Sequence, residues 1–442
     1  MPASPFDSSM YRDLFGDAEV ADLFSDSAEI RALLRVLGEL ARAQGDLGLI
    51  PTDSAAAIHA AAQTVQIDAA TLAHDTGQNA VVIPALVQAL RAAMQAPEHA
   101  QYLHWGATSQ DIIDTGLILR LADATTLYQR RLTTLTKSLG QLADTHANLP
   151  MAARTWGQSA TITSFGAVLA SWGSPLIRHL DRLGELTPRL LQVSLSGAAG
   201  TLSAMGGHGP QVRANLAKAL NLNDPQTSWH STRDPIAELS AWMTLVTGSV
   251  GKIGEDMILL AQSGIDEITL ATSGASSTMP QKSNPVLAAL MAALARHTSA
   301  LNTSMQGAIA HRAQRDGVAW LSEWLALPQI CAACGRALAA ANTLATEIAP
   351  NATRMAANIE QNHALIYAEA LTFALANQMP RPQAQTAIKA LCQQAIAENT
   401  SLIDLATSRW PDAGLAQICT PAAQLGDAPA QARRFAKAAA WL

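Results

Sequence analysis

The segment between Gly274 and Pro285, GASSTMPQKSNP, concentrates side chains that can take part in acid–base chemistry. It contains three serines, a lysine and an asparagine together with two prolines, and it lies between two long helical patterns. A plain connection between helices does not need this mixture. Because lysine supplies positive charge and the hydroxyls and amide supply hydrogen bonds, the segment is predicted to be a polar loop that closes over an anionic substrate.

A second group of polar residues, His104–Asp111 with the sequence HWGATSQD, comes just before a predicted long helix. Thr108 and Ser109 either cap this helix or, together with its free N–H groups, bind a carboxylate. His104 either orients a carboxylate or caps a helix end. The residue types alone leave these alternatives open.

Two further segments also place polar residues beside glycines. Residues 154–160 read RTWGQSA, and residues 311–317 read HRAQRDG. Arg315 either pairs with Asp316 on a solvated helix face or holds a substrate carboxylate through its two-pronged guanidinium. An Arg-Thr-Trp sequence on its own predicts little.

The elements that hold these segments are predicted to be helices. The 442-residue chain is 49% hydrophobic and only 4% aromatic, and alanine, the best helix former, dominates it. This composition predicts an all-α protein with closely packed helices. One helix is expected to begin at Asp234-Pro235 and to pack along its length against near-parallel neighbours, because its apolar residues follow a heptad pattern: Leu239, Met243, Val246, Val250, Ile253, Met257 and Leu260.

Three parts are expected along the chain. Residues 1–108 read as an N-terminal helical domain, residues 109–349 as a central domain of long helices, and residues 350–442 as a C-terminal domain of shorter helices. The long central helices carry more apolar residues than one amphipathic face requires. They are therefore predicted to form a bundle that is buried on several sides and shared between subunits.

Charge and patterning argue against several other classes of protein. The net charge is −6 with no basic block, so no nucleic-acid partner is expected. The chain has no run of eighteen apolar residues, and its first residues lack a basic start, so we expect a cytoplasmic protein without a signal peptide or membrane span. Cys331 and Cys334 lie in an alanine-rich helical run without a second pair, which favours small core residues over a redox or zinc site.

The polar segments resemble, in order and separation, the three signature regions of the fumarase/aspartase superfamily. The loop at 274–285, called the signature loop below, carries Ser276-Ser277, Met279-Pro280, Lys282 and Asn284-Pro285, with the family's leading glycine displaced to Gly274. The resemblance covers roughly residues 20–330. It implies a three-domain, all-α homotetramer in which each active site takes its three regions from three subunits. It also implies catalysis without a cofactor or metal: members remove a proton alpha to a carboxylate and expel a group from the beta carbon, or run the reverse.

Position 156 separates branches of the superfamily. The lyases carry a histidine there that protonates the leaving group, whereas this chain carries Trp156, whose indole delivers no proton at neutral pH. In this respect the chain resembles the lactonizing branch, the 3-carboxy-cis,cis-muconate cycloisomerases, as it does in Trp229-His230, Arg233-Asp234, Asn79, Ile83-Pro84 and Glu323–Pro328. The resemblance implies conversion of 3-carboxy-cis,cis-muconate to 4-carboxymuconolactone, in the protocatechuate branch of the β-ketoadipate pathway.

The chemistry of lactonization fits the loss of that histidine. A carboxylate of the substrate attacks the substrate's own double bond, and in reverse it departs with a pKa of about 4, so it needs no proton. Proton transfer at the carbon alpha to a second carboxylate is still required, together with stabilisation of the dianion formed there.

The resemblance also assigns roles to individual residues. Ser276 aligns with the superfamily's catalytic serine, and either Ser276 or Lys282 carries the proton. The substrate, a small tricarboxylate, is expected to contact residues of all three regions and Arg315: His104, Thr108, Ser109, Thr155, Trp156, Ser277, Met279, Asn284 and Arg315. A local cluster of cations and helix N-termini must therefore offset the net negative charge of the chain.

Two other functions stay open at this point. One is a beta-elimination resembling that of adenylosuccinate lyase, with the acid supplied by His104 or another histidine. The other is a structural member of the superfamily without catalysis, which would have no need of Ser276 and Lys282.

Overall fold

The computed structural model describes residues 4–271, 274–275, 278–279 and 281–442. Helices dominate this part of the chain, which confirms the predicted all-α class. The long helices are α3 (Asp26–Asp46), α8 (Ser109–Thr145), α9 (Phe165–Leu190), α11 (Asp234–Leu260), α12 (Val286–Gly307) and α13 (Gly317–Glu347). As predicted, α11 begins at Asp234 with a proline at its second position.

Shorter helices make up most of the two ends of the chain. On the N-terminal side they are α1 (Arg12–Phe15), α2 (Ala18–Leu23), α4 (Thr52–Thr64), α5 (Ala73–Asn79), α6 (Ile83–Met94) and α7 (Pro97–Ala100), and α10 (Gly209–Leu220) follows α9. On the C-terminal side they are α14 (Ala352–Glu360), α15 (Ala368–Leu375), α16 (Arg381–Glu398), α17 (Leu402–Arg409), α18 (Leu415–Ile418) and α19 (Ala428–Ala440).

The strands of the described residues are short and form antiparallel pairs. β1 (Pro150–Thr155) pairs with β2 (Gln158–Ser164), and β3 (Ile268–Leu270) pairs with β6 (Ile348–Pro350). β4 (Gly274–Ala275) pairs with β5 (Ser283–Asn284) at the base of the signature loop.

The chain divides into two compact units, each built from separate stretches of sequence. Unit 1 comprises the chain up to Arg130, His179–Gly248 and Leu294–Ala337. Unit 2 comprises Arg131–Arg178, Ser249–Ala293 and Leu338–Leu442. The boundaries fall inside long helices, so α8, α9, α11, α12 and α13 each contribute residues to both units.

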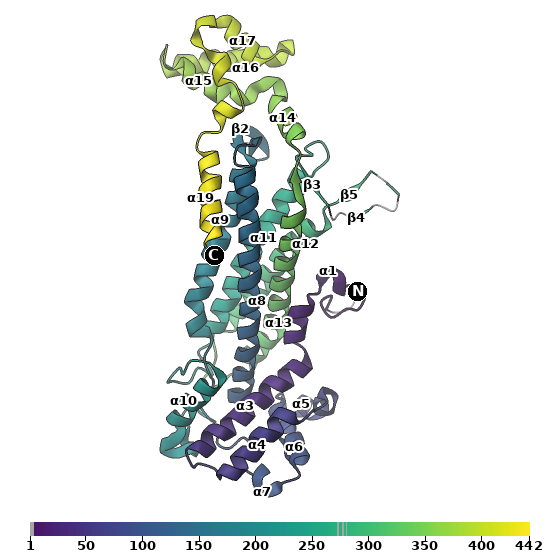
Figure 1. Ribbon diagram of the computed structural model, residues 1–442, viewed down its shortest axis with the longest axis vertical. Coiled ribbons are helices and arrows are strands. Elements are labelled where there is room, and N and C mark those ends of the chain that lie inside the picture. The colour runs from purple at the N-terminus through teal and green to yellow at the C-terminus, as the bar shows by residue number, and fades with distance from the viewer. Residues whose placement is uncertain (1–3, 272–273, 276–277, 280) are drawn as a thin grey trace. The chain divides into compact units, whose positions relative to one another are not determined.

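The core of unit 1 depends on small residues that let helices approach closely. Helices α3, α4 and α6 lie next to one another (Figure 1), and their buried apolar side chains join those of α8 and α10 in one cluster. A β-carbon on Gly45 of α3 would lie 2.4 Å from that of Ala55 in α4, so only glycine fits there. The alanine-rich composition thus serves close helix packing, as predicted.

The heptad residues of α11 are buried within a single chain. Leu239, Val250 and Leu260 are at most 5% exposed, and the other four members of the pattern are also buried. This confirms that the helix packs along its length against neighbours. Leu245 and Leu259 are the large apolar side chains of α11 that stay exposed, at 50% and 37%.

Helix α13 is a core helix. It is the one described helix long and apolar enough to cross a membrane by length and composition, but 61% of its apolar window is buried inside the protein. Cys331 and Cys334 are both buried on it, and burial raises the pKa of Cys331 to about 12. This confirms the interpretation of these cysteines as small core residues.

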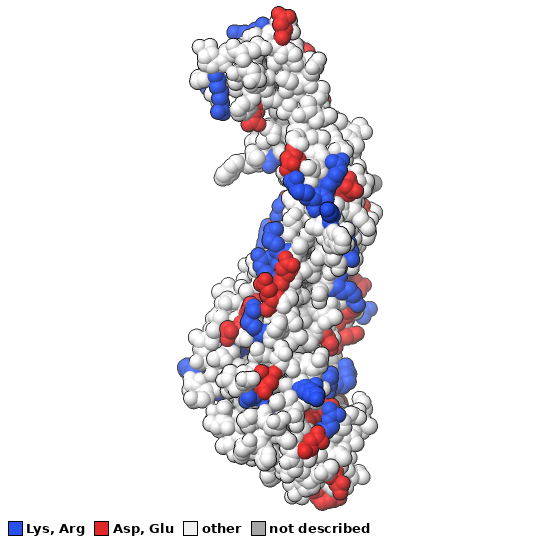
Figure 2. All heavy atoms as spheres, turned by 60° about the vertical axis from the view of Figure 1, so that its left-hand side comes forward, with Lys and Arg blue, Asp and Glu red and all other residues white. Residues whose placement is uncertain are grey.

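The charged side chains on the surface are mixed in sign. On the face drawn in Figure 2, basic and acidic residues alternate along the molecule, and no continuous basic surface is seen there. Among the described residues, no group of three histidines, cysteines or carboxylates is placed to hold a metal ion.

Candidate active site

The N-terminus of α8 is the centre of a polar cluster in unit 1. His104 and Gly106 have positive φ angles of 64° and 70°, which turn the chain into the helix. The backbone N–H of Thr108 donates to the Asp111 carboxylate over 2.9 Å, and the Asp111 N–H donates back to the Thr108 carbonyl over 3.0 Å. These two contacts fix the start of the helix, and they are made by the Asp111 carboxylate and by backbone groups of Thr108 and Asp111.

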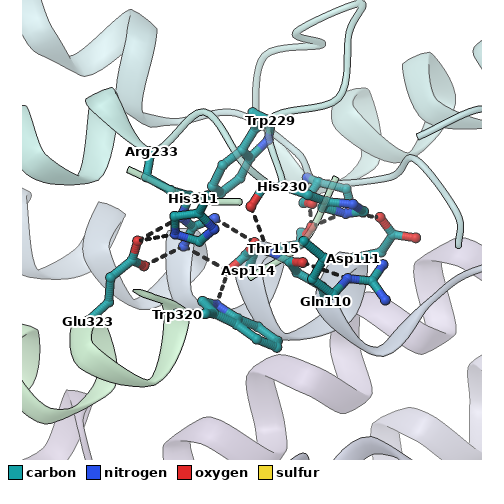
Figure 3. Close-up of polar contacts among 12 residues, drawn as sticks. Gln110, Asp111, Asp114, Thr115, Trp229, His230, Arg233, His311, Trp320 and Glu323 are labelled. Carbon is teal, nitrogen blue, oxygen red and sulfur yellow. Dashed lines mark hydrogen bonds and ion pairs between the residues drawn. The ribbon is translucent and has the colours of Figure 1, made fainter. Parts of the chain in front are cut away.

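Asp111 also anchors two loops that are distant in sequence. Its fully buried carboxylate accepts the backbone N–H groups of Ser196 and Gly197 over 2.8 and 3.0 Å. The Asp111 carboxylate also lies 2.8 Å from Nε2 of His230. This nitrogen is the donor, because a carboxylate can only accept a hydrogen bond. One side chain therefore holds the helix start, the loop at 196–197 and the His230 ring together. Figure 3 shows Asp111 beside His230.

One turn further along α8, Asp114 belongs to a buried ionic cluster. Arg233 donates to both oxygens of Asp114, over 2.7 and 3.1 Å, and to both oxygens of Glu323, over 2.9 and 2.6 Å (Figure 3). All three side chains are at most 2% exposed. Burial opposes the charge of the guanidinium, but the two carboxylates outweigh it and raise the pKa of Arg233.

Aromatic rings and a histidine complete this cluster. The Arg233 guanidinium stacks over the Trp229 ring at 4.8 Å, and the Trp320 indole N–H donates to Asp114 over 3.2 Å. The His311 side chain is buried with Nε2 3.6 Å from Glu323, too far for a hydrogen bond. Burial lowers the pKa of His311 and so favours the neutral ring, whereas the charge of Glu323 acts in the opposite direction.

Gln110 connects this cluster to Arg315. Its side-chain N–H₂ donates to Asp114 over 3.1 Å and to the His230 carbonyl over 3.0 Å. Its oxygen is thereby turned toward Arg315, whose Nε–H donates to it over 2.9 Å, while Nη2 donates to the Ala198 carbonyl over 3.1 Å. The exposed Arg315 guanidinium is thus fixed beside the N-terminus of α8.

The alternative of an Arg315–Asp316 pair is not realised. The carboxylate of Asp316 is bound by Arg312, whose Nε and Nη2 donate over 2.7 and 3.1 Å. Arg312 lies four residues before Asp316 and binds it with a two-pronged contact. Arg315 instead donates to the side chain of Gln110.

His104 lies at the same helix start. Burial lowers its pKa, while a backbone hydrogen bond with Thr108 and the charge of Asp111 act in the opposite direction. Its Nε2 is buried without a hydrogen-bond partner among the described residues. Unit 1 therefore brings together four of the predicted contact residues, namely His104, Thr108, Ser109 and Arg315.

The second region forms a hairpin in unit 2, and its tip is Thr155–Gln158. Trp156 and Gly157 occupy the two central positions of the turn, with φ angles of 53° and 74°, as in a type I′ turn. A bulky residue such as tryptophan adopts a positive φ only with strain. Trp156 is nonetheless placed there with its side chain 100% exposed.

The signature loop also belongs to unit 2. Gly274 pairs with Asn284 and Ala275 with Ser283, and the N–H of Lys282 donates to the Met279 carbonyl over 3.0 Å. Lys282 is exposed, Met279 is 42% exposed and Asn284 is half-buried. The predicted residues Ser276 and Ser277 lie outside the described residues.

The buried partners of the unit 1 cluster were not among the predicted site residues. They are Gln110, Asp111, Asp114, His230, Arg233, His311 and Glu323. One sequence signal could have found part of the set: Gln110, Asp111, Asp114 and Thr115 recur at helical spacing just before a long apolar stretch of α8.

Comparison with known proteins agrees with this architecture. Residues 11–298 match a family model described as Lyase. The 3-carboxy-cis,cis-muconate cycloisomerase of Acinetobacter baylyi is 37% identical over 405 residues, which cover 90% of this chain and 90% of that protein. The chain belongs to the fumarase/aspartase superfamily.

Within this superfamily, solved structures show the same fold. The crystal structure of the 3-carboxy-cis,cis-muconate lactonizing enzyme from Pseudomonas putida matches with a TM-score of 0.94 and 34% identity, over 98% of this chain and 99% of that one. A more distant relative is the N-acetyl-S-(2-succino)cysteine lyase of Enterococcus italicus, 32% identical over 91% of this chain and 89% of that protein.

Proposed function

We propose that the chain catalyses the intramolecular cycloisomerization of 3-carboxy-cis,cis-muconate to 4-carboxymuconolactone, a step of protocatechuate breakdown in the β-ketoadipate pathway. The observation that carries the proposal is Trp156, at a turn where the superfamily's lyases hold their acid. Its backbone has a strained positive φ, and its indole is fully exposed. No packing within the chain requires it. A lactonizing enzyme can dispense with that acid, because its reverse leaving group is a carboxylate.

The proton is carried by Ser276 or Lys282 in the signature loop. Lys282 is exposed at the loop surface, and its ammonium group there would stabilise the negative charge of an anionic intermediate. Asn284, Ser277, Met279 and Thr155 contact the same substrate.

In unit 1 the substrate carboxylates are held by Thr108, Ser109 and Arg315, with His104 beside them. The start of α8 offers free N–H groups, and Arg315 offers a guanidinium already oriented by Gln110. The residues of the chain themselves supply the charge, and the proposal requires no cofactor.

The active form is a cytoplasmic homotetramer whose sites are shared between subunits. In the single chain Trp156 is fully exposed, Lys282 is exposed, and Leu245 on α11 is 50% exposed. Large exposed apolar side chains at a hairpin turn and on a long helix are expected where another copy covers them.

Beta-elimination is the second candidate function, because a lyase that acts on a succino-cysteine derivative is 32% identical to this chain. One assay separates the two. The conjugated muconate absorbs in the ultraviolet, and its absorbance falls as the ring closes. Constant absorbance with 3-carboxy-cis,cis-muconate at high enzyme concentration, with folded protein, would contradict the proposed cycloisomerase.

A further inference from the structure

Glu267 in unit 2 is a fully buried carboxylate with three side-chain donors. Arg154 donates to it through Nη1 over 2.7 Å and through Nη2 over 2.8 Å, so the pair is bidentate. The amide of Asn358 donates to the same carboxylate over 2.9 Å. Such a geometry satisfies a buried charge and fixes the positions of all three side chains.

The backbone of Glu267 is tied to two helices. Its N–H donates to the Leu260 carbonyl at the end of α11, and its carbonyl accepts the N–H of Asn351 at the start of α14, each over 2.8 Å. The Asn358 amide also donates to the Ile265 carbonyl over 2.8 Å. Glu267 is therefore a fixed point between α11 and the C-terminal segment α14.

Two proposed active-site segments extend from this fixed point. Arg154 directly precedes Thr155 and Trp156, and a break in the β1–β2 register between Ala152 and Arg154 sets its direction. On the other side, β3 begins at the residue after Glu267 and leads toward β4 at the base of the signature loop. Among the described residues, the Arg154–Glu267 pair is the ion pair that ties this segment to the rest of unit 2.

We infer that Glu267 is a positioning residue that sets the hairpin tip through Arg154 and the entry to the signature loop through its own backbone. The C-terminal segment supports it through Asn351 and Asn358. The inference rests on the proposed function, and it gives α14 an indirect part in that function. Positioning matters because a shift of about 1 Å in a substrate-contacting segment can lower the rate about a hundredfold.

Hydrogen exchange in the intact protein tests the positioning without any substrate. Glu267→Gln keeps the shape of the side chain but removes its charge and presents an amide to Arg154. Residues 154–159 and the β4–β5 pair should exchange about tenfold faster or more, since their local opening no longer has to break a charged hydrogen bond. The amides of α11 should keep their rates. Asp224→Asn is the matched control, because it breaks another partly buried arginine–carboxylate pair, with Arg213 at 2.6 Å.

Arg154→Lys is a second, milder variant in case Glu267→Gln folds poorly. It keeps the positive charge and loses the two-pronged contact, so it should accelerate exchange in the same two segments. In lactonization, both variants should lower kcat/KM about tenfold or more relative to Asp224→Asn, and the double variant should lose no more than the worse single one.

Unchanged exchange at the tip and loop would overturn the inference, and so would acceleration spread evenly over unit 2, since that marks a purely stabilising role. If the parent enzyme leaves the muconate unchanged, the proposed function fails, but the exchange measurement still decides whether Glu267 positions these segments.

Discussion

Arg315 donates its Nε hydrogen to the side-chain oxygen of Gln110 over 2.9 Å, and Gln110 is itself held by Asp114 and the His230 carbonyl. The guanidinium is therefore oriented by a buried ionic cluster before any substrate binds. An arginine that is fixed in advance loses little conformational freedom when it binds a carboxylate, so the arrangement favours substrate binding.

Replacing Arg315 tests this role. Arg315→Gln should lower kcat/KM for the muconate by about tenfold to a hundredfold, because a charged hydrogen bond contributes about 1.5–3 kcal/mol. Steady-state kinetics should show most of the loss in KM, since the contact holds ground state and transition state alike.

Arg312→Gln is the matched control for that measurement. Arg312 is also exposed and lies three residues earlier, but it pairs with Asp316. Its loss should leave kcat/KM nearly unchanged. Equal losses in the two variants would show that Arg315 acts only through general surface charge.

Removal of the Ser276 hydroxyl tests the proton carrier. Ser276→Ala should lower turnover by about 10²–10⁴, the range typical of general acid–base groups, with an unchanged circular dichroism spectrum. Ser283→Ala, in the same loop at β5, should retain normal turnover. Near-normal turnover of Ser276→Ala would assign the proton to Lys282, whose replacement by methionine should then abolish it.

The helices could be predicted from the sequence, whereas the buried cluster could not. The heptad spacing of α11 and the Asp234-Pro235 start are local patterns, and the structure has both. Arg233, by contrast, is separated from Asp114 by 119 residues and from Glu323 by 90. No local rule pairs residues so far apart, because their contact depends on how three helices pack.

The signature residues show a second limit of local reasoning. Sequence proximity offered Asp316 as one possible partner of Arg315, but the turn before α13 places Arg312, four residues away, in reach of that carboxylate. Arg154 similarly looked like part of a substrate-contacting segment, and its guanidinium instead binds Glu267, 113 residues away.

The buried ionic cluster should matter for stability. Arg233→Met would leave Asp114 and Glu323 buried without their cation and should lower the free energy of unfolding by about 3–5 kcal/mol, measured in urea. Arg189→Met, which breaks an exposed pair with Glu238, should lower the free energy of unfolding far less, because solvent screens that pair. Similar costs for the two variants would contradict the assignment of Arg233 as the central cation.

The exposed face of α11 should hold the subunits together. Leu245→Asp changes a side chain that is 50% exposed in the single chain, so each chain should still fold. The charge should split the proposed tetramer in light-scattering measurements and abolish activity with it, since each proposed site takes residues from several chains. Ile396→Asp, at a 58% exposed position of α16, should keep both the tetramer and the activity. An active monomer would refute the shared site.

Trp156 provides the test of the lactonizing chemistry. Because its side chain is fully exposed in the single chain, Trp156→His should leave the fold and the free energy of unfolding of that chain nearly unchanged. The variant should lactonize more slowly, since a smaller polar ring replaces indole area that shapes the pocket and excludes water. Part of the loss should appear in KM.

Trp156→Phe is the control for ring size and polarity. It keeps an apolar ring without any proton to donate and should lose less activity than Trp156→His. If the histidine variant lactonizes faster than the parent, proton donation at the hairpin tip limits the reaction. A carboxylate leaving group needs no such proton, so that result would remove the chemical reason for placing a tryptophan at this turn and would favour a beta-elimination enzyme.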